Sequence, residues 1–187
     1  MRADSPLRLI PLTAEHCEAA RTWRLNDDVR GGLRTPYPLT QEMQADFYRR
    51  VVCDRASAHR YWGVARGDDT VDALSSPLVA MVGLTNISWE SGDAEISLVV
   101  SPEFRRGGRG TASVALALAE GFGNMRLVAI WGECYHSNEG GLRFWNMVVE
   151  RYKAHAVELP YRKYWEGKFH PSTIFTITEP MWRYRPC

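Results

Sequence analysis

The chain has 187 residues, and its 23 basic and 22 acidic side chains give a formal net charge of +1 at pH 7. This length allows one domain with a sizeable core and is short for two. The near balance of charge argues against a broad nucleic-acid-binding face, which needs clustered basic residues, and we expect none.

The cysteines and the N-terminal residues indicate the compartment. The 4 cysteines include no C-x-x-C pair and have no spacing typical of a metal site, so we expect reduced thiols and no metal. Asp4, Pro6 and Arg8 stand where an export signal would be apolar, and no apolar run approaches the roughly 18 residues of a membrane span. We therefore expect a cytoplasmic protein that does not bind membranes.

The N-terminal half predicts a strand, two helices and a meander of strands. Thr13 and Thr40 are suitable N-cap residues for the helices, and Cys17 and Ala20 follow helical spacing on one face of the first. The short turns of the meander predict antiparallel pairing. The expected elements are strand 7–12, helix 14–25, irregular loop 31–39, helix 41–52, strand 60–66, exposed polar loop 67–76, and strands 78–87 and 94–100.

The C-terminal half predicts two strand-helix units and a final pair of strands. Helix 110–122 is apolar on nearly every side, which is typical of a helix buried between layers. Strand 127–133 must run parallel to the strand before that helix, because the helix crosses over between them. The remaining elements are helix 138–150 and strands 152–159 and 173–178, with an aromatic and basic segment, 161–170, between the strands. We interpret this segment as a surface hairpin, with a lid over an acceptor or a dimer contact as alternatives.

The chain is organised around the turn R-R-G-G-R-G between strand 94–100 and helix 110–122. Glycines allow a tight turn that brings backbone N–H groups close to an anion. The helix that follows adds unpaired N–H groups and the positive end of its dipole. The pattern predicts a phosphate-binding turn made of Arg105, Arg106, Gly107, Gly108, Arg109, Gly110 and Thr111.

The sequence Arg105-x-x-Gly108-x-Gly110 after an apolar strand resembles the acetyl-CoA pyrophosphate loop, (Gln/Arg)-x-x-Gly-x-(Gly/Ala), of the GNAT N-acyltransferases. Asn138 also stands where GNAT proteins place an Asn before the helix beside the coenzyme. Three segments resemble the branch that acetylates ribosomal-protein N-termini and amino sugars: L-R-L-I-P-L at 7–12, W-R-L-N at 23–26 and T-I-F-T-I-T at 173–178.

This resemblance implies the fold. We expect a single α/β (α+β) domain over residues 1–187. Its central sheet would be mixed and mostly antiparallel, with one splayed parallel pair of strands and helices on both faces.

The resemblance also implies the coenzyme site, with acetyl-CoA as the acyl donor. In GNAT proteins the strand before the turn diverges from the next parallel strand, and the pantetheine arm lies in the opening. Backbone groups of Leu98, Val99 and Val100 would pair with the pantetheine, and the turn would hold the pyrophosphate. Asn138 would reach the coenzyme or act only as an N-cap.

The acceptor side is implied in the same way. GNAT proteins commonly form one wall of the acceptor pocket from the loop and helix that correspond to 31–52. Arg34 and Tyr37 are therefore candidate substrate contacts, and an ordinary solvated loop is the alternative.

Catalysis requires the free base of the amine. Deprotonating a lysine-like amine at pH 7 costs roughly 4–5 kcal/mol, so a nearby base would help. Glu95 is the candidate, since it shares a strand face with Ser97 and Val99 and resembles an acidic position of related acyltransferases. A structural ion pair is the alternative.

The general acid is a point of departure from the family. Many GNAT enzymes carry a Tyr seven residues after the Asn, and this chain has Trp145 there. An indole donates a hydrogen bond but cannot act as an acid. We select Tyr135 as the substitute, ahead of His136, Ser137 and Tyr152.

These features predict an N-acetyltransferase that moves an acetyl group from acetyl-CoA to a primary amine by direct attack in a ternary complex. A non-catalytic coenzyme A-binding sensor or scaffold is the alternative, prompted by Trp145. A dinucleotide-binding oxidoreductase is less favoured, because Gly108-x-Gly110-x-x-Ser113 lacks the third glycine of that fingerprint. The sequence leaves open whether the acceptor amine belongs to a small molecule or to a peptide terminus. It also leaves open whether the protein forms a homodimer.

Overall fold

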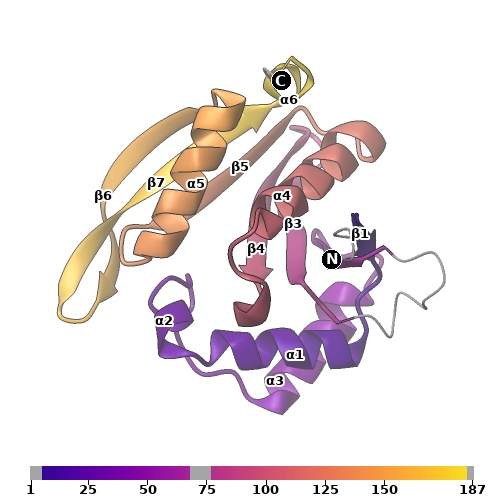
Figure 1. The fold of residues 1–187 in the computed structure, drawn as a ribbon, viewed down its shortest axis with the longest axis vertical. Coiled ribbons are helices and arrows are strands. Elements are labelled where there is room, and N and C mark those ends of the chain that lie inside the picture. The colour runs from indigo at the N-terminus through magenta and orange to yellow at the C-terminus, as the bar shows by residue number, and fades with distance from the viewer. Residues whose placement is uncertain (1–5, 68–76, 185–187) are drawn as a thin grey trace.

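The computed structural model describes residues 6–67 and 77–184 and contains one seven-stranded sheet in the order β1-β2-β3-β4-β5-β7-β6 (Figure 1). Its elements are β1 (Leu7–Ile10), α1 (Ala14–Arg24), α2 (Asp27–Arg30), α3 (Gln41–Phe47), β2 (Arg60–Arg66), β3 (Ala80–Ser88), β4 (Asp93–Val100), α4 (Arg109–Ala119), β5 (Ala129–Tyr135), α5 (Glu139–Tyr152), β6 (His155–Trp165), β7 (Lys168–Thr178) and α6 (Glu179–Arg183). Single π-helical turns extend α3 over Tyr48–Val52 and α4 over Glu120–Asn124.

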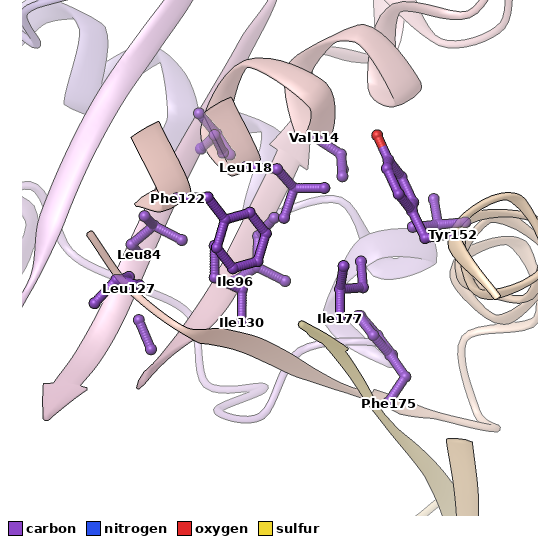
Figure 2. Packing of buried hydrophobic residues seen from close by; sticks show 14 of the residues in the cluster. Leu84, Ile96, Val114, Leu118, Phe122, Leu127, Ile130, Tyr152, Phe175 and Ile177 are labelled. Carbon is purple, nitrogen blue, oxygen red and sulfur yellow. The ribbon is translucent and has the colours of Figure 1, made fainter. Parts of the chain in front are cut away.

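Helices cover both faces of the sheet, as predicted. On one face α1 and α3 pack through Cys17, Ala20 and Phe47 against residues of β2 and β3. On the other face α4 and α5 cover the larger core, and Figure 2 shows Leu118 and Phe122 lying over Ile96 and Ile130. Every strand neighbour pairs antiparallel except β4 with β5, which confirms the mixed, mostly antiparallel sheet.

The parallel pair is short. Its register joins Asp93, Ala94 and Glu95 of β4 to Ala129, Ile130 and Trp131 of β5, and no pairing follows. β4 remains bonded to β3 as far as Val100, and β5 remains bonded to β7 as far as Tyr135. The two strands therefore run apart toward the end of the sheet where α2 lies (Figure 1). This opening determines where the site can be.

Local sequence signals account for the helix starts. The N–H of His16 donates to the hydroxyl of Thr13 at 3.2 Å, and the N–H of Met43 donates to that of Thr40 at 3.2 Å. Both threonines are the predicted N-caps. The first strand ends at Ile10 rather than at residue 12, because Pro11 cannot donate a ladder hydrogen bond.

Two sequence-based expectations were wrong. α4 is not buried all round: Ser113, Val114, Ala117 and Leu118 are buried, but Ala119 is exposed, because the sheet lies against only one side of the helix. The last two strands are longer than predicted, since 161–170 is the end of a continuous hairpin that turns at Glu166 and Gly167 with φ values of 50° and 79°. Most of β6 is exposed, so its residues carry no alternation that a sequence could reveal.

The predicted loop 67–76 lies, beyond Gly67, outside the described residues. In the part of the chain that is described, no helix is long and apolar enough to span a membrane.

Leu118→Ala tests the packing of the helix that follows the glycine-rich turn. Leu118 is fully buried, so its loss leaves a cavity, and we expect a destabilisation of about 2–5 kcal/mol in urea unfolding. Met43→Ala on the exposed side of α3 is the matched control and should stay within about 0.5 kcal/mol of wild type. Equal losses in both variants would contradict the assigned core.

Candidate active site

A cleft of about 1240 Å³ occupies the opening between β4 and β5. Its floor includes β4 from Glu95 to Val100. At one end lies the glycine-rich turn, and at the other lie Glu95, Glu133 and Tyr135. Such a volume is large enough for an extended ligand and a second small molecule together.

The turn has the backbone that its glycines predict. Arg106, Gly107 and Gly108 have positive φ values of 73°, 71° and 78°, and Gly108 is the N-cap of α4. The first helical hydrogen bond runs from the N–H of Ala112 to the carbonyl of Gly108 at 2.9 Å. The amides before it belong to the first turn, whose N–H groups have no partner within the helix. They lie at the edge of the cleft.

The predicted coenzyme residues gather in this cleft. Its walls include all but one of them, namely Leu98, Val99, Val100, Arg105, Arg106, Gly108, Arg109, Gly110, Thr111 and Asn138. Gly107 is the exception and faces solvent beside Arg109, whose guanidinium also lies over the ring of Phe104 with its carbon 5.6 Å from the centroid.

Asn138 acts as an N-cap, which is one of the two roles that the sequence predicted, beside contact with the coenzyme. Its Oδ1 accepts a hydrogen bond from the N–H of Gly141 at 2.9 Å, so the residue is the N-cap of α5. It also packs against Gly32, where a Cβ would lie only 2.3 Å from the amide nitrogen of Asn138. The residue therefore joins the start of α5 to the loop that follows α2.

Glu95 lies at the last parallel pair between β4 and β5 and is 8% exposed. Arg34 donates to both of its carboxylate oxygens, from Nη2 at 2.6 Å and from Nη1 at 3.1 Å. Asn86 adds a third donor at 2.9 Å, from a β-bulge between Thr85 and Ser88. The predicted base and a predicted substrate contact are thus ion-paired with each other.

Glu133 forms a second acidic centre on β5. Its side chain is 3% exposed and accepts hydrogen bonds from Ser172 at 2.7 Å, Arg162 at 3.1 Å and Arg34 at 3.3 Å. Burial alone would raise the pKa of this carboxyl group. The Ser172 and Arg162 hydrogen bonds, with the charges of Arg162 and Arg34, outweigh it and lower the pKa below its ordinary value.

Lys163 holds the loop 31–35 against the cleft. Its ammonium donates to the carbonyl oxygens of Gly31, at 2.5 Å, and Leu33, at 2.7 Å. It also lies 5.2 Å from the ring centroids of both Tyr135 and Trp165. The residue is 8% exposed, and this burial lowers its pKa. The loop that carries Arg34 is therefore fixed from the β6–β7 hairpin.

Two other predicted residues have clear positions. Tyr37 is 73% exposed and does not line the cleft, so the structure does not bring it to the site. Tyr135 does line the cleft, and its hydroxyl lies 3.4 Å from Glu133. Trp145 also lines the cleft, and it stacks on Phe175 with the ring centroids 4.8 Å apart.

Several residues of the site were not predicted. None of Glu133, Arg162, Lys163 and Ser172 was assigned to this site from the sequence. Lys163 and the loop that it holds are separated by about 130 residues, and no local pattern signals such a contact. Among the described residues, no group of three or more His, Cys, Asp or Glu side chains could hold a metal ion.

The pH dependence of the stability of Glu133→Gln tests whether the charge of Glu133 stabilises the fold. Folding lowers the pKa of Glu133 from its ordinary value of 4.5, so the stabilisation by its carboxylate is complete above about pH 4.5. It is lost as the pH falls through the lower pKa of the folded state. The variant should be less stable than wild type near neutral pH, and the difference should shrink as the pH falls. Urea unfolding from about pH 7 to about pH 3 measures it.

Glu150→Gln, on the exposed side of α5, is the control and should follow the wild-type curve throughout. A Glu133→Gln deficit that does not change with pH would show that packing, and not the charge, is the lost contribution.

Comparison with known proteins agrees with this architecture. A model of the family described as "Acetyltransferase (GNAT) domain" matches residues 6–145. No curated protein matches the sequence. Among solved structures, the chain is similar to spermidine N-acetyltransferase from Vibrio cholerae in complex with CoA and spermine, with a TM-score of 0.77 and 17% identity over 95% of this chain and 98% of that one.

A chimera of the Vibrio cholerae enzyme SpeG and hSSAT gives a TM-score of 0.77 and 16% identity over 97% of this chain and 100% of that one. At such identities the likeness shows the fold alone. The branch that acetylates ribosomal-protein N-termini and amino sugars is not confirmed. Because the family model covers most of the sequence, the chain belongs to the GNAT acetyltransferase family and is an acyltransferase that uses acetyl-CoA as its acyl donor.

Proposed function

We propose that this enzyme transfers the acetyl group of acetyl-CoA to a primary amine by direct attack in a ternary complex. The observation that carries the proposal is the separation of β4 from β5 after Glu95, which opens one continuous cleft from the glycine-rich turn to the acidic residues. A thioester that enters from one end and an amine that enters from the other would meet near Glu95. Holding both in one cleft supplies much of the acceleration.

The donor side rests on backbone groups. We place the pyrophosphate at the amides of Gly108, Arg109 and Gly110, with the arginines of the turn around it. The edge of β4 from Leu98 to Val100 has no strand partner on the side of β5. Its N–H and C=O groups would pair with the amides of the pantetheine arm, as an added strand would.

Proton transfer on the acceptor side remains a proposal. Glu95 would accept a proton from the bound ammonium, directly or through a water, and the free amine would then attack the thioester carbonyl. Both carboxylate oxygens already accept hydrogen bonds from Arg34, and one also accepts from Asn86, so a water-mediated path is the simpler one. Tyr135 would protonate the leaving thiolate, a fair leaving group because a thiol pKa is near 8.5.

The acceptors named for the similar structures are spermidine and spermine, which are polycations. In this cleft Glu95 and Glu133, the carboxylates nearest the point where the strands part, are already matched by Arg34 and Arg162. Glu139 and Glu166 also line the cleft and are exposed. We therefore keep the acceptor as a primary amine and include spermidine, an amino sugar and a peptide N-terminus in the first assay panel. Release of free coenzyme A thiol above the solvent rate, with one of these amines, would establish transfer.

Gly108→Glu tests the placement of the pyrophosphate. A carboxylate at the N-cap of α4 would repel the phosphates and block their approach, so we expect acetyl-CoA affinity to fall by more than about 100-fold in calorimetric titration. Gly167→Glu is a closely matched control: its φ is 79° against 78° for Gly108, and in neither case does a Cβ meet an atom within 4 Å. Both variants carry the same backbone strain, and only the first should lose the coenzyme.

Glu95→Gln tests the base. If Glu95 accepts the proton, kcat should fall by about 100-fold or more across the pH range while acetyl-CoA affinity stays unchanged. Arg34→Met is the companion variant, because it removes the partner and leaves the carboxylate. A similar loss of kcat in both variants, with the pH profile unaltered, would show that the ion pair is needed and that Glu95 is not the base.

A further inference from the structure

Arg24, the last residue of α1, lines the cleft and has an unusual environment. Its Nε is buried and has no hydrogen-bond partner, and within the described residues no ion pair involves its guanidinium. Burial lowers its pKa. The C-terminal end of a helix does favour a cation, but by only about 0.3–1 kcal/mol. The residue is half-buried, and this small gain does not account for an Nε that is buried without a partner.

Two of the carboxylates that line the cleft are already paired: Glu95 is held by Arg34, and Glu133 is held by Arg162 and Arg34. Two more, Glu139 and Glu166, also line it and are exposed. Within the described residues, no acidic side chain acts on Arg24, and Tyr61 is the one titratable group that does. Arg24 is therefore a cation of the cleft that the described part of the chain leaves without an ionic partner.

Tyr61 links Arg24 to the reacting end of the cleft. Burial is the main reason that its pKa is raised, and the charges of Arg24, Glu95 and Arg34 all act on its hydroxyl. Its ring packs edge-on against Phe47, with the centroids 5.2 Å apart. A ligand bound to Arg24 would thus lie against an aromatic wall and extend toward Glu95.

Resting on the proposed acetyl transfer, we propose that the acceptor amine carries an anionic group, a carboxylate or a phosphate, and that Arg24 binds this group while the amine lies near Glu95. A guanidinium offers paired N–H donors that match either anion. Spermidine and spermine have no such group, so this site would separate the enzyme from the polyamine acetyltransferases whose fold it shares.

Matched amine pairs test the proposal by calorimetric titration into the coenzyme A-loaded protein. The carboxylate arm compares 6-aminohexanoate with hexylamine, the phosphate arm compares glucosamine 6-phosphate with glucosamine, and spermidine is the polycationic probe. In at least one arm we expect the anionic member to bind about 10–100-fold more tightly than its neutral partner, as a charge-assisted hydrogen bond predicts. The arm that shows the preference identifies the anion.

Arg24→Met keeps the length of the side chain and removes the charge, and it should reduce that preference to less than about 3-fold. Arg24→Lys should retain part of it, and Arg151→Met, on the exposed side of α5, should retain all of it. Neutral amines or spermidine that bind as tightly as the anionic probes, or a preference that survives in Arg24→Met, would overturn the proposal.

A second readout separates binding from a purely structural role. The Nε of Arg24 is buried without a hydrogen bond and the side chain has no ion pair among the described residues, so it contributes no polar contact to the ligand-free fold. Arg24→Met should therefore unfold at the same temperature as wild type or at a higher one. A lower unfolding temperature would show that Arg24 holds the fold together and would overturn the proposal.

Turnover then distinguishes this proposal from the transferase proposal. Thiol release at equal kcat/KM for anionic and neutral amines would refute the acceptor class and leave the acetyl transfer standing. An anion preference that depends on Arg24, without thiol release from any amine, would support Arg24 as an anion-binding residue and refute the acetyl transfer.

Discussion

The three-residue parallel pairing of β4 with β5 is the constraint on which the rest of the structure depends. Beyond Glu95 each strand stays bonded on its outer side, β4 to β3 and β5 to β7, so the separation leaves one free edge on each. Helices α4 and α5 hold the two parts of the sheet together from one face, through a core that includes Ile130 and Phe175. Free edges inside a protein need a partner, and here an extended coenzyme arm can supply it.

Ionic contacts cross the same opening near the end of the parallel pairing. Arg34 reaches Glu95 on β4 and Glu133 on β5, so a single guanidinium bridges the two strands where they begin to part. Lys163 fixes the backbone of the loop that carries it. The side chain of Arg34 is still 52% exposed, which weakens the pairing through solvent screening. In the proposed reaction an incoming amine would meet a carboxylate that is already occupied, and its proton would have to leave past Arg34 or through water.

The features that sequence could predict are those encoded within about one element. The glycines of the turn, the threonine N-caps and the crossover that makes β5 parallel to β4 each depend on neighbours in the chain, and each is found. The surface hairpin at 161–170 was predicted, but the lengths of β6 and β7 were underestimated, because exposed strands lack alternation. Contacts such as Arg34 with Glu95 and Lys163 with Gly31 join distant segments, and only the folded chain brings them together. Tyr37 shows the reverse error, since a residue on the right loop can still point away from the site.

The likeness to spermidine acetyltransferases extends to the fold alone. The splayed strands belong to the sheet that positions the proposed donor site. In the proposed reaction the acceptor would also meet the end of α1 and the loop after α2, where Arg24 and Arg34 line the cleft. Arg24 adds a cation there, while Glu95 and Glu133 are neutralised by arginines from a loop and a hairpin. If the proposals hold, a polycation would gain little from Glu95 and Glu133, which already have partners, and would be repelled by Arg24. The same scaffold could then serve acceptors of opposite charge, because the residues that line the acceptor end can change while the sheet stays the same.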